Sequence, residues 1–388
     1  MATVLVVVGC VHSREEVSIA PLAPAAGRVD PGLGPGTRAL SSGPGYKGSP
    51  SWSPGGDRIA FTIDGYVVDK PADSEDLRRW TTRDFVAQDT EWISDDTLTM
   101  LGAAPGSSPP PDDPSNSVYR ARAGKSSLEL EKVANRALAM SPGPDREGLI
   151  LALENWEHES GLVLTDGNGE VYRLYTKLIQ GHVTALSPSP DGNEVVLAVR
   201  PPGDLKSSEL RVFDLRKGES REILRLHGNQ EILGTPQWTK QDIYFVAGKK
   251  LAKLDEDGSE PLYDLYRVPA DGGEPEFAPG VGEDFVAASV RVSPDGEQLA
   301  VIGRLNPKSP ANLYVLDLLA KDLKAVTTNE DMEIKTGPDD LAWSPGGKSV
   351  AIVARGTPST EPEVRAEPVD RLLRDFYNLY EVPVGGTR

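Results

Sequence analysis

Cysteine and histidine are scarce in this chain, which excludes several kinds of chemistry. Among 388 residues there are one cysteine and four histidines. A single cysteine excludes any internal disulfide. The sequence also has neither the Gly-x-Ser-x-Gly turn of serine hydrolases nor the His-Glu-x-x-His motif of zinc peptidases. We therefore expect a protein that is not an enzyme and binds no metal or cofactor. A catalytic site gathered from distant segments around one centre stays open as the alternative.

Basic residues and long apolar runs are also in short supply. Asp and Glu number 59 against 41 Lys and Arg, so the net charge is −18. Nucleic acids and anionic lipid surfaces attract basic patches, so charge argues against both as partners. No segment reaches the ~20 consecutive apolar residues of a membrane span. The acidity is most simply read as a contribution to solubility.

The one cysteine ends a short apolar run. Residues 4–9 precede Cys10 with the sequence VLVVVG, which resembles the lipobox of bacterial lipoproteins. The run is short and no Lys or Arg precedes it, so a buried N-terminal strand is the alternative. We predict a lipoprotein signal over residues 1–10 with lipidation at Cys10, then a Pro/Gly/Ala-rich spacer over residues 11–36. The expected location is extracytoplasmic, membrane-tethered or secreted, with the lipid as the only membrane contact.

One four-residue turn recurs along the rest of the chain, at about the spacing of propeller blades. It occurs as Ser53-Pro54-Gly55-Gly56, Ser141-Pro142-Gly143-Pro144, Ser189-Pro190-Asp191-Gly192, Ser293-Pro294-Asp295-Gly296 and Ser344-Pro345-Gly346-Gly347, with degenerate copies at residues 94–96 and 239–241. Pro presets the first corner of such a turn, and Gly takes a positive φ without a steric penalty. A short apolar run follows each copy, and third and fourth strand patterns come next. The seven copies predict an all-β, seven-bladed β-propeller of four-stranded antiparallel blades, with six or eight blades less favoured.

Tryptophan marks the residue before the turn in four of the copies. Trp52, Trp92, Trp238 and Trp343 hold this position, and together with Pro54, Pro142, Pro190, Pro294 and Pro345 they define the structural repeat. The rings could form a set of aromatic binding platforms. We favour packing of each blade against the next, because a fixed place in a repeat is what packing between repeats requires.

The two ends of the repeat region predict how the ring closes. The last blade lacks a fourth strand, and residues 37–41 resemble a fourth strand without a blade. We expect this strand to pair with the segment 380–384, which would remove the open sheet edges. The propeller would then span residues 37–388.

The repeat resembles that of the TolB family of periplasmic proteins. The segments Pro50–Phe61 and Leu341–Ala351 carry the resemblance. It implies a propeller of the cell envelope with a protein partner. TolB also has an α/β domain ahead of six blades, whereas here 52 residues precede the first turn and there are seven copies. Similar repeats occur in the propellers of prolyl-oligopeptidase-type peptidases.

Long insertions fall between the second and third strands of the blades, and all of them are expected on one face of the ring. Loops on a rigid scaffold commonly carry binding sites. The candidate binding residues are Trp156 and His158 in one such loop, and Leu372, Leu373 and Phe376 at helical spacing in the last. The predicted function is a monomeric, non-enzymatic scaffold that binds a protein, peptide or glycan of the cell envelope. The alternative is a lyase, lactonase or hydrolase with its site at the central channel.

Overall fold

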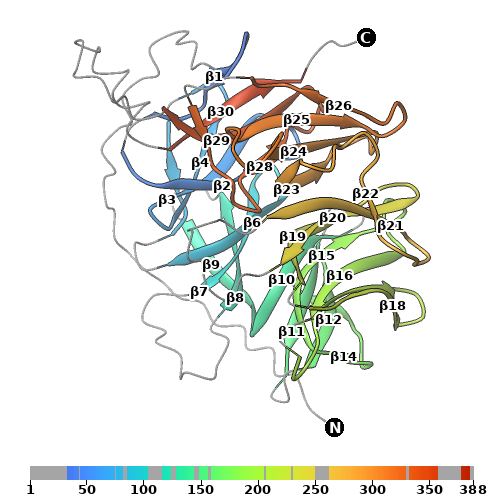
Figure 1. Ribbon diagram of the computed structural model, residues 1–388. Coiled ribbons are helices and arrows are strands. Elements are labelled where there is room, and N and C mark those ends of the chain that lie inside the picture. The colour runs from blue at the N-terminus through green and yellow to red at the C-terminus, as the bar shows by residue number, and fades with distance from the viewer. Residues whose placement is uncertain are drawn as a thin grey trace.

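The molecule is a closed ring of seven antiparallel sheets, as the turn repeat predicts (Figure 1). This computed structural model describes residues 33–42, 44–74, 76–81, 85–103, 116–123, 128–143, 148–155, 159–204, 207–228, 230–249, 262–328, 332–356 and 377–384. Every regular element within these ranges is a strand. No helix in them is long and apolar enough to cross a membrane.

The strands of each blade follow one another in the sheet in chain order, beginning at the central channel. The first three blades contain β2 (Lys47–Trp52), β3 (Arg58–Ile63), β4 (Tyr66–Pro71) and β5 (Arg78–Arg79); β6 (Val86–Ser94), β7 (Thr97–Ala103), β8 (Asn116–Ala123) and β9 (Leu128–Asn135); and β10 (Ala137–Pro142), β11 (Leu149–Glu154), β12 (Glu159–Thr165) and β13 (Val171–Leu174), with β14 (Ile179–Gln180) also paired to β12.

The next three blades repeat this order. They contain β15 (His182–Pro188), β16 (Glu194–Arg200), β17 (Ser208–Asp214) and β18 (Glu219–Leu226); β19 (Gln230–Trp238), β20 (Asp242–Lys249), β21 (Tyr263–Pro269) and β22 (Glu276–Phe277); and β23 (Val286–Val292), β24 (Gln298–Arg304), β25 (Asn312–Asp317) and β26 (Asp322–Ala325). In blade 7 the inner strand is split into β27 (Met332–Ile334) and β28 (Leu341–Trp343). Both pieces pair with β29 (Ser349–Gly356), which is followed by β30 (Asn378–Pro383).

The serine of the repeated turn explains why the turn joins two strands so reliably. In blade 4 the amide of Gly192 donates to the carbonyl of Ser189 at 2.9 Å, and Gly192 has φ of 70°. The hydroxyl of Ser189 accepts from the amide of Glu194 at 3.0 Å, where the second strand starts. The equivalent serine hydroxyls of blades 1, 6 and 7 accept in the same way. The serine therefore satisfies a backbone donor that would otherwise be left over at the turn.

The N-terminal strand closes the ring where the sequence predicts. Strand β1 (Arg38–Ala39) pairs antiparallel with β30, with Arg38 opposite Glu381 and Ala39 opposite Tyr380. It supplies the fourth strand that blade 7 lacks, and Figure 1 shows it beside β30. The inner strands of neighbouring blades contact one another all the way round, including β2 with β28. The two ends of the described chain therefore depend on each other.

Candidate functional site

Each repeat tryptophan lies between its own blade and the preceding one. Trp92 donates its indole N–H to the carbonyl of Ser51 in blade 1 at 3.1 Å, and Trp343 donates to the carbonyl of Arg291 in blade 6 at 2.9 Å. Trp52 shares a core cluster with residues of blade 7, and Trp238 shares one with residues of blade 4. All four rings are at least nine-tenths buried. All four residues nevertheless contribute to the wall of the channel, so they belong to the site as well as to the packing.

The inner strands share an irregularity that shapes the channel. In five blades one extra residue interrupts the pairing of the inner strand at mid-height, as between Ala87 and Asp89 in blade 2. In blade 5 the irregularity is wider, because Leu233 and Gln237 pair with Val246 and Tyr244. In blade 7 it is a whole loop, residues 335–340, between β27 and β28. A bulge bends its strand and aims its side chains away from the regular ladder.

The loop of residues 335–340, here called the plug loop, reaches across the channel. The carbonyl of Pro338 accepts from the hydroxyl of Ser289 in blade 6 at 2.7 Å. Pro338 also lies against Gly234 in the wide bulge of blade 5, where an added Cβ would come within 2.8 Å of the proline ring. On the other side, the carboxylate of Asp340 accepts from the amide of Ser49 in blade 1 at 3.4 Å. A loop of blade 7 that touches blades 1, 5 and 6 must lie within the channel.

A cavity of about 580 Å³ fills the half of the channel that opens at the Ser-Pro turns. All seven blades line it. The lining comprises the four repeat tryptophans, the five repeat prolines, polar residues of the turns, and Asp339 of the plug loop. The lining residues come from the second half of each inner strand, starting at Ser49 in blade 1 and Asp89 in blade 2, and from the turns that follow. The first halves of these strands do not line the cavity. The plug loop therefore forms the floor of the cavity.

Three charged side chains from three blades meet at this floor. Arg291 of blade 6 donates to the carboxylate of Asp339 at 2.5 Å. Asp89 of blade 2 is half-buried and has its own backbone neighbour, the Thr90 amide, as a donor at 2.8 Å. Burial raises the pKa of Asp89 to about 7, and the nearby charge of Asp339 adds to the rise while Arg291 opposes it. Two carboxylates thus lie within the electrostatic influence of one guanidinium, which is paired with Asp339.

The raised pKa of Asp89 predicts a pH-dependent stability. Between about pH 4 and pH 7 the folded protein keeps the proton on Asp89, whereas the unfolded chain has lost it. Because the folded state binds more protons in this range, the free energy of unfolding falls as the pH rises. We expect Asp89→Asn to raise the free energy of unfolding by roughly 1–4 kcal/mol above pH 7, and by about a third as much at pH 5. Urea unfolding at pH 5 and pH 8.5 measures the difference. An equal effect at the two pH values would contradict the assignment.

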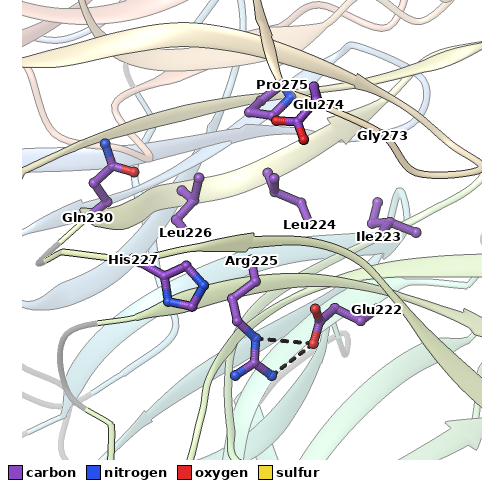
Figure 2. Close-up of a pocket in the computed structure, with 10 residues that line it drawn as sticks. All are labelled: Glu222, Ile223, Leu224, Arg225, Leu226, His227, Gln230, Gly273, Glu274 and Pro275. Carbon is purple, nitrogen blue, oxygen red and sulfur yellow. Dashed lines mark hydrogen bonds and ion pairs between the residues drawn. The ribbon is translucent and has the colours of Figure 1, made fainter.

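A second, smaller pocket of about 320 Å³ lies at the outer edge of blade 4 (Figure 2). It is lined by residues 222–227 of β18 and the segment after it, by Gln230, and by residues 273–275 of blade 5. Its one guanidinium, that of Arg225, is already paired with the carboxylates of Glu222 and Glu209. The cavity in the channel is larger and is formed by all seven blades, so we take it as the candidate site.

The binding residues expected from the sequence are not tested by this arrangement. Cys10, Trp156, His158, Leu372, Leu373 and Phe376 all lie outside the described residues. Sequence reasoning missed Asp89, Arg291 and Asp339, although each lies on or beside an inner strand near the repeated turn. Within the described part of the chain, no group of three or more His, Cys, Asp or Glu side chains is placed to hold a metal ion.

Comparison with known proteins identifies the fold. No protein-family model matches the sequence, and no curated protein matches it. The structure is similar to hydrazine synthase of Kuenenia stuttgartiensis, with a TM-score of 0.54, 16% identity, and coverage of 84% of this chain and 99% of that one. It is also similar to the propeller domain of the Trilobed protease of Pyrococcus furiosus, with a TM-score of 0.53, 12% identity, and coverage of 80% and 91%.

A structure assigned to TolB of Agrobacterium tumefaciens matches at a TM-score of 0.47 and 15% identity, over 83% of this chain and 94% of that one. That TM-score is too low to add to the argument. The other two neighbours differ from each other in function, and their identities are low. The comparisons therefore agree with a β-propeller fold, whose seven blades the sheet topology gives, and leave its particular function to be argued from the site.

Proposed function

We propose that this protein is a non-enzymatic binding scaffold of the cell envelope that holds a protein, peptide or glycan in the channel cavity. The plugged cavity carries this proposal. Its volume lies within the range of ligand sites, and its wall of tryptophan and proline rings with a few polar groups has the composition of such sites. The TolB-like repeat supports an envelope location. The extracytoplasmic location and the lipid anchor at Cys10 belong to the same proposal.

Site-specific photocrosslinking tests where a partner binds. A photoreactive amino acid replaces Lys240 at the cavity, Tyr46 on the opposite face, or Leu319 at the outer edge of blade 6; all three side chains are exposed. Irradiation in an envelope extract of the native host should give a crosslinked band at position 240 and none at 319. A crosslink at position 46 alone would place binding on the face that carries the long loops. Crosslinking at none of the three would contradict the scaffold.

Radioactive palmitate labelling tests the anchor. We expect label on the wild-type protein expressed in a bacterial host and none on Cys10→Ala. Absence of label from both, or equal label on both, would remove the lipoprotein assignment without affecting the channel site.

One observation favours the alternative, a lyase, lactonase or hydrolase. A carboxyl group with a pKa near 7 in a confined site is suited to general acid–base catalysis. Turnover of a lactone or glycoside that is lost in Asp89→Asn, with folding unchanged, would favour an enzyme over the scaffold.

A further inference from the structure

The charges that line the channel cavity are unbalanced. Four carboxylates line it, those of Asp89, Glu91, Asp295 and Asp339, against two cations, Lys240 and Arg291. Low-dielectric walls focus such an imbalance into the cavity, and the net charge of −18 adds to it. A positively charged ligand would therefore be attracted into this cavity, and a negatively charged one would be repelled.

One of the two excess negative charges lies at the floor. Asp295 near the mouth is satisfied within its own turn, where it accepts from the hydroxyl of Ser293 at 2.6 Å and the amide of Glu297 at 3.0 Å. At the floor, Asp89 and Asp339 face a single guanidinium, that of Arg291. The carboxylate of Asp340, also in the plug loop, forms an ion pair with the ammonium of Lys335 at 2.9 Å. The floor thus has one carboxylate more than it has cations.

The walls above the floor suit a long side chain with a cationic end. The four tryptophan rings and five proline rings line the cavity on all sides. Apolar rings pack well on the methylene stem that carries an ammonium or guanidinium group. A volume of about 580 Å³ accommodates one side chain of this kind together with the backbone that presents it.

From these observations we infer that the cavity recognises a basic side chain, an arginine or lysine presented by a peptide segment, whose charged end pairs with Asp89 and Asp339 at the floor. The inference rests on the proposed function, because it names the chemistry of the ligand that the scaffold holds. In the empty cavity the excess charge at the floor is relieved by a proton, which agrees with the raised pKa of Asp89. A bound cation replaces that proton.

The test uses short peptides of matched shape. Acetyl-Gly-X-Gly-amide, with X as arginine, its neutral isostere citrulline, or glutamate, is titrated into the full-length protein labelled with 5-fluorotryptophan. Fluorine NMR resolves the six tryptophans, which are assigned by single substitutions. The arginine peptide should shift the resonances of Trp52, Trp92, Trp238 and Trp343 and leave that of Trp80, which does not line the cavity, unchanged. Citrulline should bind at least about tenfold more weakly, because it cannot form charge-assisted hydrogen bonds.

Two variants locate the interaction. Asp89→Asn should weaken binding of the arginine peptide by about tenfold or more, whereas the fully exposed Asp271→Asn should leave it unchanged. Affinity in the wild type should rise between pH 5.5 and pH 8, because Asp89 must lose its proton to hold the cation, and this rise should vanish in Asp89→Asn. The other charged groups that line the cavity are Asp339, Arg291, Glu91, Lys240 and Asp295. If the affinity of Asp89→Asn still depended on pH, the titrating group would be one of the three carboxylates in this set instead of Asp89.

The outcomes separate this inference from the proposed function. If the citrulline or glutamate peptide binds the cavity as tightly as the arginine peptide or more tightly, recognition of a basic side chain is wrong, but the proposed binding scaffold is not contradicted. The inference is overturned if none of the three peptides shifts the cavity tryptophan resonances at 20 mM, because any binding free energy would then be smaller than about 2 kcal/mol. Photocrosslinking at position 240 then tests the scaffold independently. If Asp89→Asn fails to fold, the comparison of arginine with citrulline in the wild type still decides.

Discussion

Deletion of residues 37–41 is expected to destabilise the whole ring rather than one blade. These residues contain β1 and two positions that are almost fully buried, Leu40 and Ser41. The amide of Leu40 donates to the carbonyl of Leu379 at 2.8 Å, and the hydroxyl of Ser41 accepts from the amide of Leu379 at 2.9 Å. The carbonyl of Leu40 also accepts from the buried ammonium of Lys70 at 2.6 Å. One short segment therefore ties blade 7 to blade 1.

The expected loss is large because several contributions disappear together. Removal of one buried leucine costs roughly 2.7–5 kcal/mol, and each lost hydrogen bond adds about 1 kcal/mol. We expect the melting temperature to fall by roughly 5–10 °C, because an unfolding entropy of about 2.1 cal/mol/K per residue makes each kcal/mol worth only about 1 °C in a chain of 388 residues. Leu40→Ala should give a smaller fall in the same direction. Leu319→Ala, at a position 94% exposed, is the control. A deletion variant that melts with the wild type would show that β1 does not hold the ring.

The blades could be predicted from the sequence because each one is specified locally. The turn around Ser189 is complete within six residues, and its serine, proline and glycine each have a separate structural role. Repetition of that local unit fixes the number of blades. Closure by residues 37–41 follows from a count of the predicted strands, because the last blade lacks a fourth strand and residues 37–41 form a strand that belongs to no other blade. Neither step requires knowledge of contacts between distant residues.

The site could not be predicted in this way, because it depends on residues that only the closed ring brings together. Asp89, Arg291 and Asp339 lie in blades 2, 6 and 7. In the sequence each is a charged residue near a strand end, which is usually exposed to solvent. One signal was present: residues 234–236 and 336–338 read Gly-Thr-Pro and Thr-Gly-Pro, turn-forming sequences within inner strands. These are the two wide bulges that meet in the channel. The signal was not specific, because Gly48-Ser49-Pro50 in β2 reads similarly and forms only a one-residue bulge.

Asp69→Ala is expected to produce a large loss of stability from a single substitution. The carboxylate of Asp69 is fully buried on β4 and accepts hydrogen bonds from three side chains. Arg78 donates to it at 2.8 and 3.1 Å, the indole of Trp80 donates at 2.7 Å, and Arg58 forms a further ion pair. Arg78 also lies over the ring of Trp80 at 4.3 Å. The carboxylate thus organises the outer half of blade 1.

Removal of this carboxylate leaves two guanidinium groups close together with no anion between them, and one buried N–H without an acceptor. Loss of one partner from a buried ion pair costs roughly 3–5 kcal/mol, and partial exposure of both arginines places the expected value near 3 kcal/mol. Asp69→Asn keeps an acceptor for Trp80 and should cost about half as much.

Asp73→Ala provides the matched control in the same blade. Asp73 forms an ion pair with Arg38, but its side chain is 87% exposed, so its loss should cost less than about 1 kcal/mol. Urea unfolding followed by tryptophan fluorescence compares the three variants, and Trp80 reports on the site itself. If Asp69→Ala were as stable as Asp73→Ala, the buried network would be contributing nothing beyond a surface ion pair. A loss confined to Asp69 would instead show that blade 1 is held by charge at its outer edge as well as by the apolar packing between blades.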